Sequence, residues 1–246
     1  GASVTSTLPG GKVETVVVTA SSTYSSAMHA VLTDTIEVNF VPGDRYVSET
    51  GNDTLNNCLV KAAPCRTIAY AVGQAANDDT INVAAGVYTE TEITLNKDLT
   101  LRGGHSPNFS VWNPEAYVTI IDAQKKGRVL NIFGGPTVEG FTLQNGATDG
   151  SGGGVYISLG SPILRRNVII SNTAGSYGGG IYNNNLFGTP RLERNVVAFN
   201  TAEWGGGFAS SAHSPEFWNN LVYRNTANAS GGGVYVDAGS PLIWHD

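Results

Sequence analysis

Apolar and polar residues alternate in short runs throughout the second half of the chain. One apolar position follows each of four glycine triplets, and another lies two residues beyond each of four Ser-Pro or Thr-Pro steps. These positions are Val155, Ile181, Phe208 and Val234, and then Leu164, Leu192, Phe217 and Ile243. Alternation with a period of two is typical of a strand that buries one face. The runs therefore predict short strands that recur at a fixed interval.

A third run in each repeat predicts two further apolar columns with one column between them. The first contains Phe141, Val168, Val196 and Leu221, the second contains Leu143, Ile170, Ala198 and Tyr223, and Thr142, Ile169, Val197 and Val222 stand between them. The sequence thus predicts three strands in each repeat. Equivalent strands of successive repeats would stack about 4.8 Å apart through parallel hydrogen bonds.

The repeat is confirmed by its polar landmarks. The glycine triplets begin at Gly152, Gly178, Gly205 and Gly231, at spacings of 26, 27 and 26 residues. A period in this range indicates a solenoid. The leucine spacing of leucine-rich repeats is not seen, so we predict an all-β fold, a parallel β-helix with three-stranded coils of about 26 residues. Asparagines that end the third strand are expected to form a turn ladder: Asn145, Asn172, Asn200 and Asn225.

The chain divides into three segments before and within these repeats. Residues 1–45 read as a strand-rich arm or linker, in which residues 12–19 and 35–40 are predicted to be strands. Residues 46–104 read as an entry module and 105–246 as coils, of which the last is incomplete. The entry module contains one amphipathic helix, predicted over residues 67–76, with Ile68, Ala71, Val72 and Ala75 on one face. Laid over the first coil, such a helix would cover an open sheet edge.

Charge and cysteine content limit the partners and the compartment. The net charge is −6 without a basic cluster, which argues against a nucleic-acid partner. No run of 18 apolar residues exists, so we expect no membrane span in this chain. Cys58 and Cys65 have no neighbouring histidine or cysteine that would complete a zinc site, and a local disulfide is the favoured interpretation. Such a bond would imply an oxidising compartment, whereas two unpaired thiols are the alternative.

Together, these phrases resemble those of a known group of proteins. Gly-Gly-Gly-Val/Ile-Tyr, Ser-Pro and Asn-x4-Asn-Thr-Ala resemble the right-handed β-helix repeats of bacterial secreted and surface proteins of the choice-of-anchor type, and more distantly the chlamydial polymorphic outer-membrane repeats. The entry phrases around Tyr46 and Gly86 are also similar, so the resemblance covers residues 46–246. It implies the fold and an extracellular or cell-surface location. The group mixes adhesins, anchored proteins and members without an assigned activity.

The sequence contains few candidate catalytic residues. A lyase requires an acidic calcium cluster with a nearby base, and a glycosidase requires paired carboxylates. Glu193 and Glu216 lie on neighbouring coils, but each stands beside an arginine, Arg165 and Arg191 respectively, which favours surface ion pairs. We assign no catalytic residue, no metal ligand and no cofactor, and the sequence favours a protein that is not an enzyme.

Aromatic residues supply the candidate glycan contacts. An outward strip for sugar rings would use Tyr156, Tyr182, Tyr235, Trp218 and Trp244. The alternative is that these side chains only stack between coils. Ala209 interrupts the tyrosine column, which argues against a continuous strip.

The last repeat stops before its third strand, which leads to the functional hypothesis. An uncapped solenoid has an adhesive sheet edge, so the chain is expected either to belong to a longer surface protein or to join end to end into a fibre. We predict an extracellular structural or adhesive surface protein whose partner is another copy, a surface or a glycan. A carbohydrate-binding or polysaccharide-degrading β-helix protein is the alternative.

Overall fold

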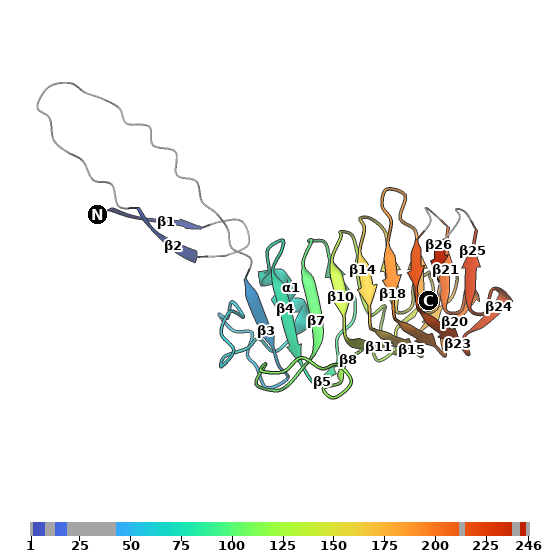
Figure 1. Ribbon diagram of the computed structural model, residues 1–246, viewed down its shortest axis with the longest axis horizontal. Coiled ribbons are helices and arrows are strands. Elements are labelled where there is room, and N and C mark those ends of the chain that lie inside the picture. The colour runs from blue at the N-terminus through green and yellow to red at the C-terminus, as the bar shows by residue number, and fades with distance from the viewer. Residues whose placement is uncertain (1, 8–12, 19–42, 212–214, 238–241, 245–246) are drawn as a thin grey trace, which may run out of the picture.

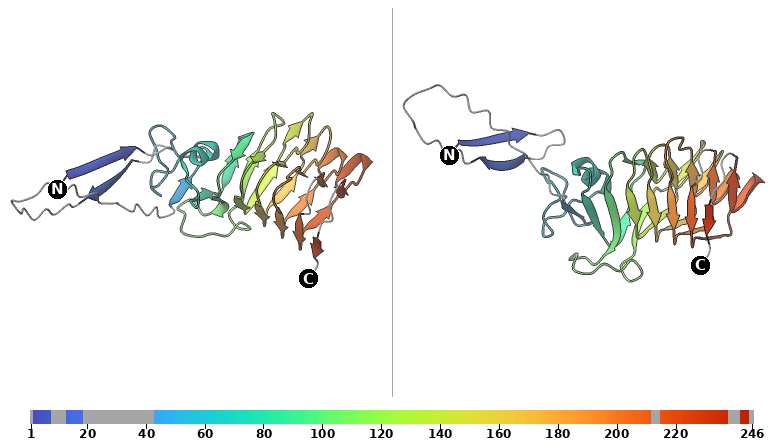
Figure 2. Two further views of the ribbon diagram at one scale, coloured as in Figure 1. Left: turned by 90° about the horizontal axis from the view of Figure 1, so that it is seen from above. Right: turned by 45° about the horizontal axis from the view of Figure 1, so that its top comes forward.

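The chain forms a parallel β-helix, as the repeats predict. The computed structural model describes residues 2–7, 13–18, 43–211, 215–237 and 242–244. From residue 43 onward the strands coil around one axis into a rod (Figure 1), and their sheets run side by side along it (Figure 2). The predicted strand at Thr35–Phe40 lies outside the described residues. The predicted strand near residue 16 is β2 (Val13–Val18), which pairs antiparallel with β1 (Ala2–Thr7).

Three parallel sheets make up most of the wall of the rod. Sheet 1 contains β3 (Asp44–Val47), β4 (Thr80–Ala84), β7 (Thr100–His105), β10 (Thr137–Glu139), β14 (Ile163–Arg165), β18 (Arg191–Glu193), β22 (Glu216–Trp218) and β26 (Leu242–Trp244). Sheet 2 contains β5 (Gly86–Tyr88), β8 (Thr119–Asp122), β11 (Phe141–Gln144), β15 (Val168–Ile170), β19 (Val196–Ala198) and β23 (Leu221–Tyr223). Sheet 3 contains β6 (Ile93–Leu95), β9 (Leu130–Ile132), β13 (Val155–Ile157), β17 (Ile181–Asn183), β21 (Phe208–Ser210) and β25 (Val234–Val236).

A fourth, narrower sheet was not predicted. Sheet 4 contains β12 (Ala147–Thr148), β16 (Thr173–Ala174), β20 (Thr201–Trp204) and β24 (Thr226–Ser230), and each of these strands follows a strand of sheet 2 and precedes one of sheet 3. Its sequence signal is the Thr-Ala pair that follows the second asparagine of the repeat. Two of these strands, β12 and β16, have only two residues each, which is too short to show the alternation by which the other strands were predicted.

The register of sheet 2 corrects the predicted columns by one residue. Thr142, not Phe141, lies beside Val168, and Leu143 lies beside Ile169. The inward column is therefore Leu143, Ile169, Val197 and Val222, of which the first three are buried. Apolar residues at three successive positions, as in Val168–Ile170, hide the period of two, because the outward positions are also apolar.

The interior of the rod is a stack of apolar side chains from the three main sheets. Leu164 and Leu192 of sheet 1 face the axis together with Ile169 of sheet 2 and Val155 and Ile181 of sheet 3, and all are fully buried. Burying one such side chain contributes about 1.5–3 kcal/mol. The repeated columns thus supply a continuous core along the rod.

Helix α1 (Ile68–Gln74) packs on the first coil, as predicted. Its apolar residues Ile68, Ala71 and Val72 are buried against the core, and the helix lies beside β3, β4 and β6. Thr67 caps its first turn through a bond from the Tyr70 amide. The Glu90 carboxylate accepts the amides of Ile68 and Ala69 at 2.7 and 2.8 Å. Loop chemistry thus anchors the helix that covers the end of the rod.

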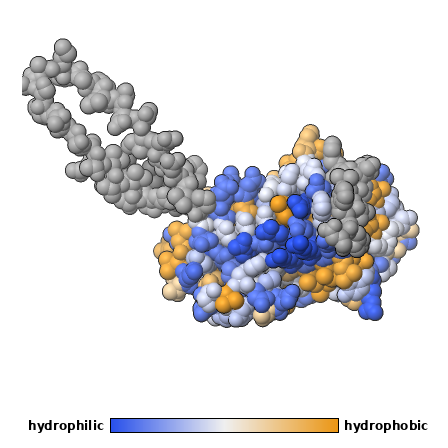
Figure 3. All heavy atoms as spheres, viewed as in Figure 1, coloured by the Kyte–Doolittle hydropathy of each residue, from blue (hydrophilic) through white to orange (hydrophobic). Residues whose placement is uncertain are grey.

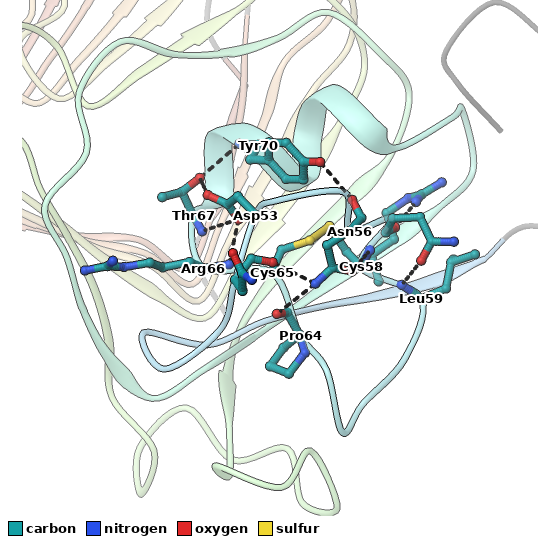
Figure 4. The surroundings of a disulfide bond; sticks show 12 residues. Asp53, Asn56, Cys58, Leu59, Pro64, Cys65, Arg66, Thr67 and Tyr70 are labelled. Atoms are coloured by element: carbon teal, nitrogen blue, oxygen red, sulfur yellow. Dashed lines mark hydrogen bonds between the residues drawn. A yellow bond between two sulfur atoms is a disulfide. The ribbon is translucent and has the colours of Figure 1, made fainter.

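The predicted disulfide between Cys58 and Cys65 is present next to this helix (Figure 4). Both cysteines are fully buried, and strand β3 bonds to both sides of the bridge: the Tyr46 amide donates to the Cys58 carbonyl and the Cys65 amide donates to the Tyr46 carbonyl. Asp53 ties the same loop to the helix by accepting the amides of Arg66 and Thr67. The bridge therefore fastens the loop to both β3 and α1.

Removing the bridge is expected to weaken the entry module. With cysteines seven residues apart, closing this short loop contributes about 2 kcal/mol by restricting the unfolded chain. Cys58→Ala/Cys65→Ala should therefore lower the thermal midpoint by several degrees, and reductant should lower that of the native chain equally. Calorimetry with and without reductant checks this. A native chain that is insensitive to reductant would contradict it, and the double variant serves as the control for reductant effects elsewhere.

No helix of the described residues is long and apolar enough to cross a membrane.

Candidate binding surface

A column of aromatic side chains stands on the outer face of sheet 3. Tyr156 of β13 and Tyr182 of β17 are register neighbours whose ring centroids are 5.7 Å apart. The next two positions of the column are Ala209 and Tyr235. Because strands stack in register, each outward position recurs directly above its equivalent. The sequence therefore located three members of this column.

Two further aromatic residues close the gap at Ala209. Tyr177 stacks on Tyr182 at 5.6 Å, on Trp204 at 5.0 Å, and lies 6.0 Å from Tyr235. Ala209 does interrupt the tyrosine column, as expected, but Tyr177 contacts the rings on both sides of the gap, those of Tyr182 and Tyr235. Sequence reasoning missed Tyr177 and Trp204, although both occupy the position just before a glycine triplet.

Polar groups border the aromatic column. The Tyr182 hydroxyl bonds with Ser211, whose hydroxyl donates to Asn184, and the Asn184 amide donates to the Tyr156 hydroxyl. The Tyr235 hydroxyl donates to Asp237 at 3.3 Å. Burial raises the pKa of the Tyr182 hydroxyl, so it stays protonated at neutral pH. Tyr182 is buried, whereas Tyr156, Tyr177, Trp204 and Tyr235 are partly exposed. Partly exposed rings beside amide, hydroxyl and carboxylate groups have the chemistry that suits a sugar ring.

The two predicted tryptophans belong to a different face. Trp218 lies on β22, and Trp244 lies in register with it on β26, both in sheet 1. The guanidinium carbon of Arg191 lies 5.2 Å from the centre of the Trp218 ring. The five predicted aromatics therefore do not form one strip, because the strand after the proline and the strand after the glycine triplet belong to separate sheets.

The asparagine ladders are structural, and one predicted member does not belong to them. The side-chain amide of Asn172 donates to Asn200 at 3.0 Å, and that of Asn200 donates to Asn225 at 3.0 Å. Asn145 lies one residue earlier, in register with Ser171, and Gly146 occupies the ladder position. Asn167, Asn195 and Asn220 form a second ladder of the same kind at the preceding corner.

The predicted charge pairs are register neighbours with different ionic partners. Arg165 lies beside Glu193, but its guanidinium bonds to Glu139 of the preceding coil at 2.6 Å. Arg191 pairs with Glu193 of its own strand at 3.4 Å. Glu139, at 1% exposed, also accepts Arg102 at 2.6 Å. Burial opposes its ionisation, yet the two guanidinium groups hold the pKa of Glu139 below its usual range.

Two buried titratable groups, His105 and Asp79, have pKa values below their usual range. Burial lowers the pKa of His105 to about 4, so its ring is neutral at physiological pH. Burial also opposes the ionisation of Asp79, but its pKa is lowered by backbone amides and by the buried Arg45, whose guanidinium lies 2.8 Å away. No group of three or more metal-ligating side chains occurs in the described part of the chain.

Comparisons with protein-family models, curated proteins and solved structures find nothing that matches this chain. The resemblance to choice-of-anchor proteins therefore stays an interpretation of the motifs.

Proposed function

We propose that this chain is a rigid structural and adhesive segment of an extracellular surface protein. The observation that carries the proposal is the contiguous row of aromatic side chains on a stiff rod of hydrogen-bonded coils. Neighbouring rings of this row have their centroids 5.0–6.0 Å apart. A surface whose shape is fixed before binding loses little conformational entropy when its ligand binds.

The disulfide supports an extracellular location. Bridges persist in oxidising compartments and are rare in the cytosol. Antibodies against the folded rod should therefore label intact cells that produce the protein. Labelling that appears only after the cells are permeabilised would contradict the location. End-to-end association of the rods stays a prediction of the sequence.

A glycan is the partner we propose for the aromatic column. Tyrosine and tryptophan offer an apolar ring face with a polar edge, and the Asn184 and Asp237 side chains lie where sugar hydroxyls would bond. The polysaccharide-degrading alternative is less well supported, because the described residues bring no suitable pair of carboxylates together at this face.

Removing the rings of the central pair is expected to abolish this binding. Tyr177→Ser/Trp204→Ser introduces the residue that Ser151 and Ser230 already place before the other two triplets. The backbone there accepts serine, so the fold should persist while glycan binding falls about tenfold or more, given about 1–3 kcal/mol for each lost aromatic contact. Trp218→Ser removes an aromatic from sheet 1 and should leave binding unchanged. A neutral-glycan array checks the result, and equal loss in both variants would contradict the site.

A further inference from the structure

A second surface, on sheet 1, carries a dense group of arginines. Arg102, Arg165, Arg166 and Arg194 surround a hollow of about 320 Å³, together with Trp112 and the two carboxylates of Glu139 and Glu193. On the face shown in Figure 3, strongly hydrophilic residues gather over the middle of the rod, where β10, β14 and β18 lie in Figure 1. The four arginines exceed the two glutamates, although the chain as a whole carries −6. The hollow is thus a locally cationic site on an acidic protein.

The buried carboxylate of Glu139 holds two of these arginine side chains in place. This carboxylate binds the Nε atoms of Arg102 and Arg165, each at 2.6 Å. Those two side chains remain 34% and 40% exposed. A guanidinium has five N–H donors in a rigid plane, so a bond at Nε leaves other donors directed outward. One buried acid therefore orients two cationic groups towards solvent.

Trp112 holds the third arginine over the same hollow. The guanidinium carbons of Arg102 and Arg166 lie 5.4 and 5.6 Å from its ring centre. The indole Nε1 donates to the Gly103 carbonyl at 2.8 Å, which fixes the ring. In the described part of the chain, no ion pair neutralises Arg166.

The turn that follows each sheet 1 strand, here called the corner, has a backbone conformation that does not favour the arginines found there. Arg166 and Arg194 occupy the same corner of successive coils, and both have a φ of 53°. Residues other than glycine, asparagine and aspartate seldom adopt this left-handed conformation. The next coil has Asn219 at the same corner, with a φ of 52°. Two arginines in place of asparagine thus add positive charge where the turn favours another residue.

We propose that this hollow binds an acidic polysaccharide through the carboxylate or sulfate groups of its sugars. Guanidinium groups bind such oxyanions in bidentate fashion. Arg166 and Arg194 stand on successive coils, about 4.8 Å apart along the rod, which suits a polymer with a charge on successive sugars. Arg102 and Arg165 lie two coils apart on either side of Glu139. Nucleic acid fits less well, because base stacking requires free aromatic faces and the Trp112 ring already contacts two arginines. The site lies on a different sheet from the aromatic column and does not depend on it.

Binding to four immobilised polymers tests this inference. They are polygalacturonate, dextran sulfate, neutral dextran and single-stranded DNA, each offered to the whole chain at low and at moderate salt. The test variant is Arg166→Asn/Arg194→Asn, which copies Asn219 and so preserves the corner. Its matched control is Arg224→Asn, since Arg224 occupies the other corner of the coil at a φ of 51°, where Asn145 already stands at 55°.

The expected result is binding to one or both acidic polysaccharides, weakened by salt, with none to neutral dextran. The double variant should lose about tenfold or more in affinity while Arg224→Asn retains it. Preference between polygalacturonate and dextran sulfate identifies the acidic group. The proposal is overturned if neither polysaccharide binds, if the double variant binds as well as the native chain, if Arg224→Asn loses as much affinity, or if DNA binds at least as tightly. The Arg166→Asn/Arg194→Asn variant should still bind the neutral-glycan array, because the aromatic column is unchanged. A failure of the arginine site can therefore be told apart from a failure of the aromatic site.

Discussion

Replacing Asn200 by serine is expected to destabilise the folded chain by about 3 kcal/mol or more, because the change leaves buried backbone groups without partners. Asn200 is fully buried between two coils. Its side-chain amide donates to the Ile169 carbonyl at 2.9 Å, and its side-chain oxygen accepts the Asn172 amide at 3.0 Å. Serine is too short to reach either group, and each unsatisfied buried group costs about 1–3 kcal/mol.

The matched control is Asn145→Ser, the same substitution at a position that resembles the ladder only in sequence. Asn145 is half-buried and donates to Asp122, and the next coil has Ser171 at the equivalent corner. Its φ of 55° matches the 57° of Ser171, so serine fits the turn. We expect a cost below about 1 kcal/mol. Urea unfolding of both variants checks the difference, and equal costs would show that the ladder bonds contribute nothing specific.

Asn145 also shows why the sequence predicted the fold better than the details. The period of 26 or 27 residues and the apolar columns after the glycine triplets were sufficient to predict a parallel β-helix, because stacking requires the same residue type at the same place in every coil. Asn145 stands seven residues before its glycine triplet, whereas the ladder members Asn172, Asn200 and Asn225 stand six, five and six residues before theirs, so the distance alone does not identify the ladder position. A one-residue shift of this kind is decided by hydrogen bonds between coils, which the spacing of motifs does not reveal.

The two candidate surfaces show the same limit. The column of Tyr156, Tyr182 and Tyr235 was predictable because its members follow a repeated landmark. Trp112 was not, because it comes from the loop after β7, outside the repeats, and reaches the arginines only through the folded chain. Likewise, the Arg165–Glu139 pair joins coils in the opposite direction from the predicted Arg165–Glu193 pair. A repeat predicts which residues lie side by side on neighbouring coils. Whether a charged side chain pairs with the preceding or the following coil depends on side-chain geometry.

The glycine triplets permit an equally sharp test of how the coils stack. Each triplet bonds to the next through its backbone: the amides of Gly179 and Gly180 donate to the carbonyls of Gly205 and Gly206 at 3.2 and 3.1 Å. Only the first glycine of each triplet has a left-handed φ, between 63° and 73°. The third glycine needs no special backbone angle, so its role must come from close contact with the neighbouring coil.

Gly180→Ala is accordingly expected to cost about 3 kcal/mol or more. A Cβ at Gly180 would lie 2.6 Å from the Gly207 carbonyl oxygen and 2.9 Å from the Asn200 side-chain nitrogen. That carbonyl accepts the Ile181 amide at 2.9 Å, so it cannot retreat without breaking the bond between the coils. Overpacking against backbone is harder to relieve than overpacking against a flexible side chain.

Gly233→Ala is the matched control, because it changes the same position of the last triplet. There the nearest atom to a new Cβ is the Val222 Cγ1, at 3.5 Å, an ordinary contact. The unfolded chain loses flexibility when glycine becomes alanine, so this variant should be neutral or up to about 1 kcal/mol more stable. Chemical unfolding measures the free energy of unfolding of both variants. The difference between them separates the effect of losing backbone freedom from the effect of crowding the neighbouring coil. If both variants were destabilised alike, contact between coils would not explain the third glycine of the triplet. A cost confined to Gly180→Ala places the role of this glycine in the contact between coils.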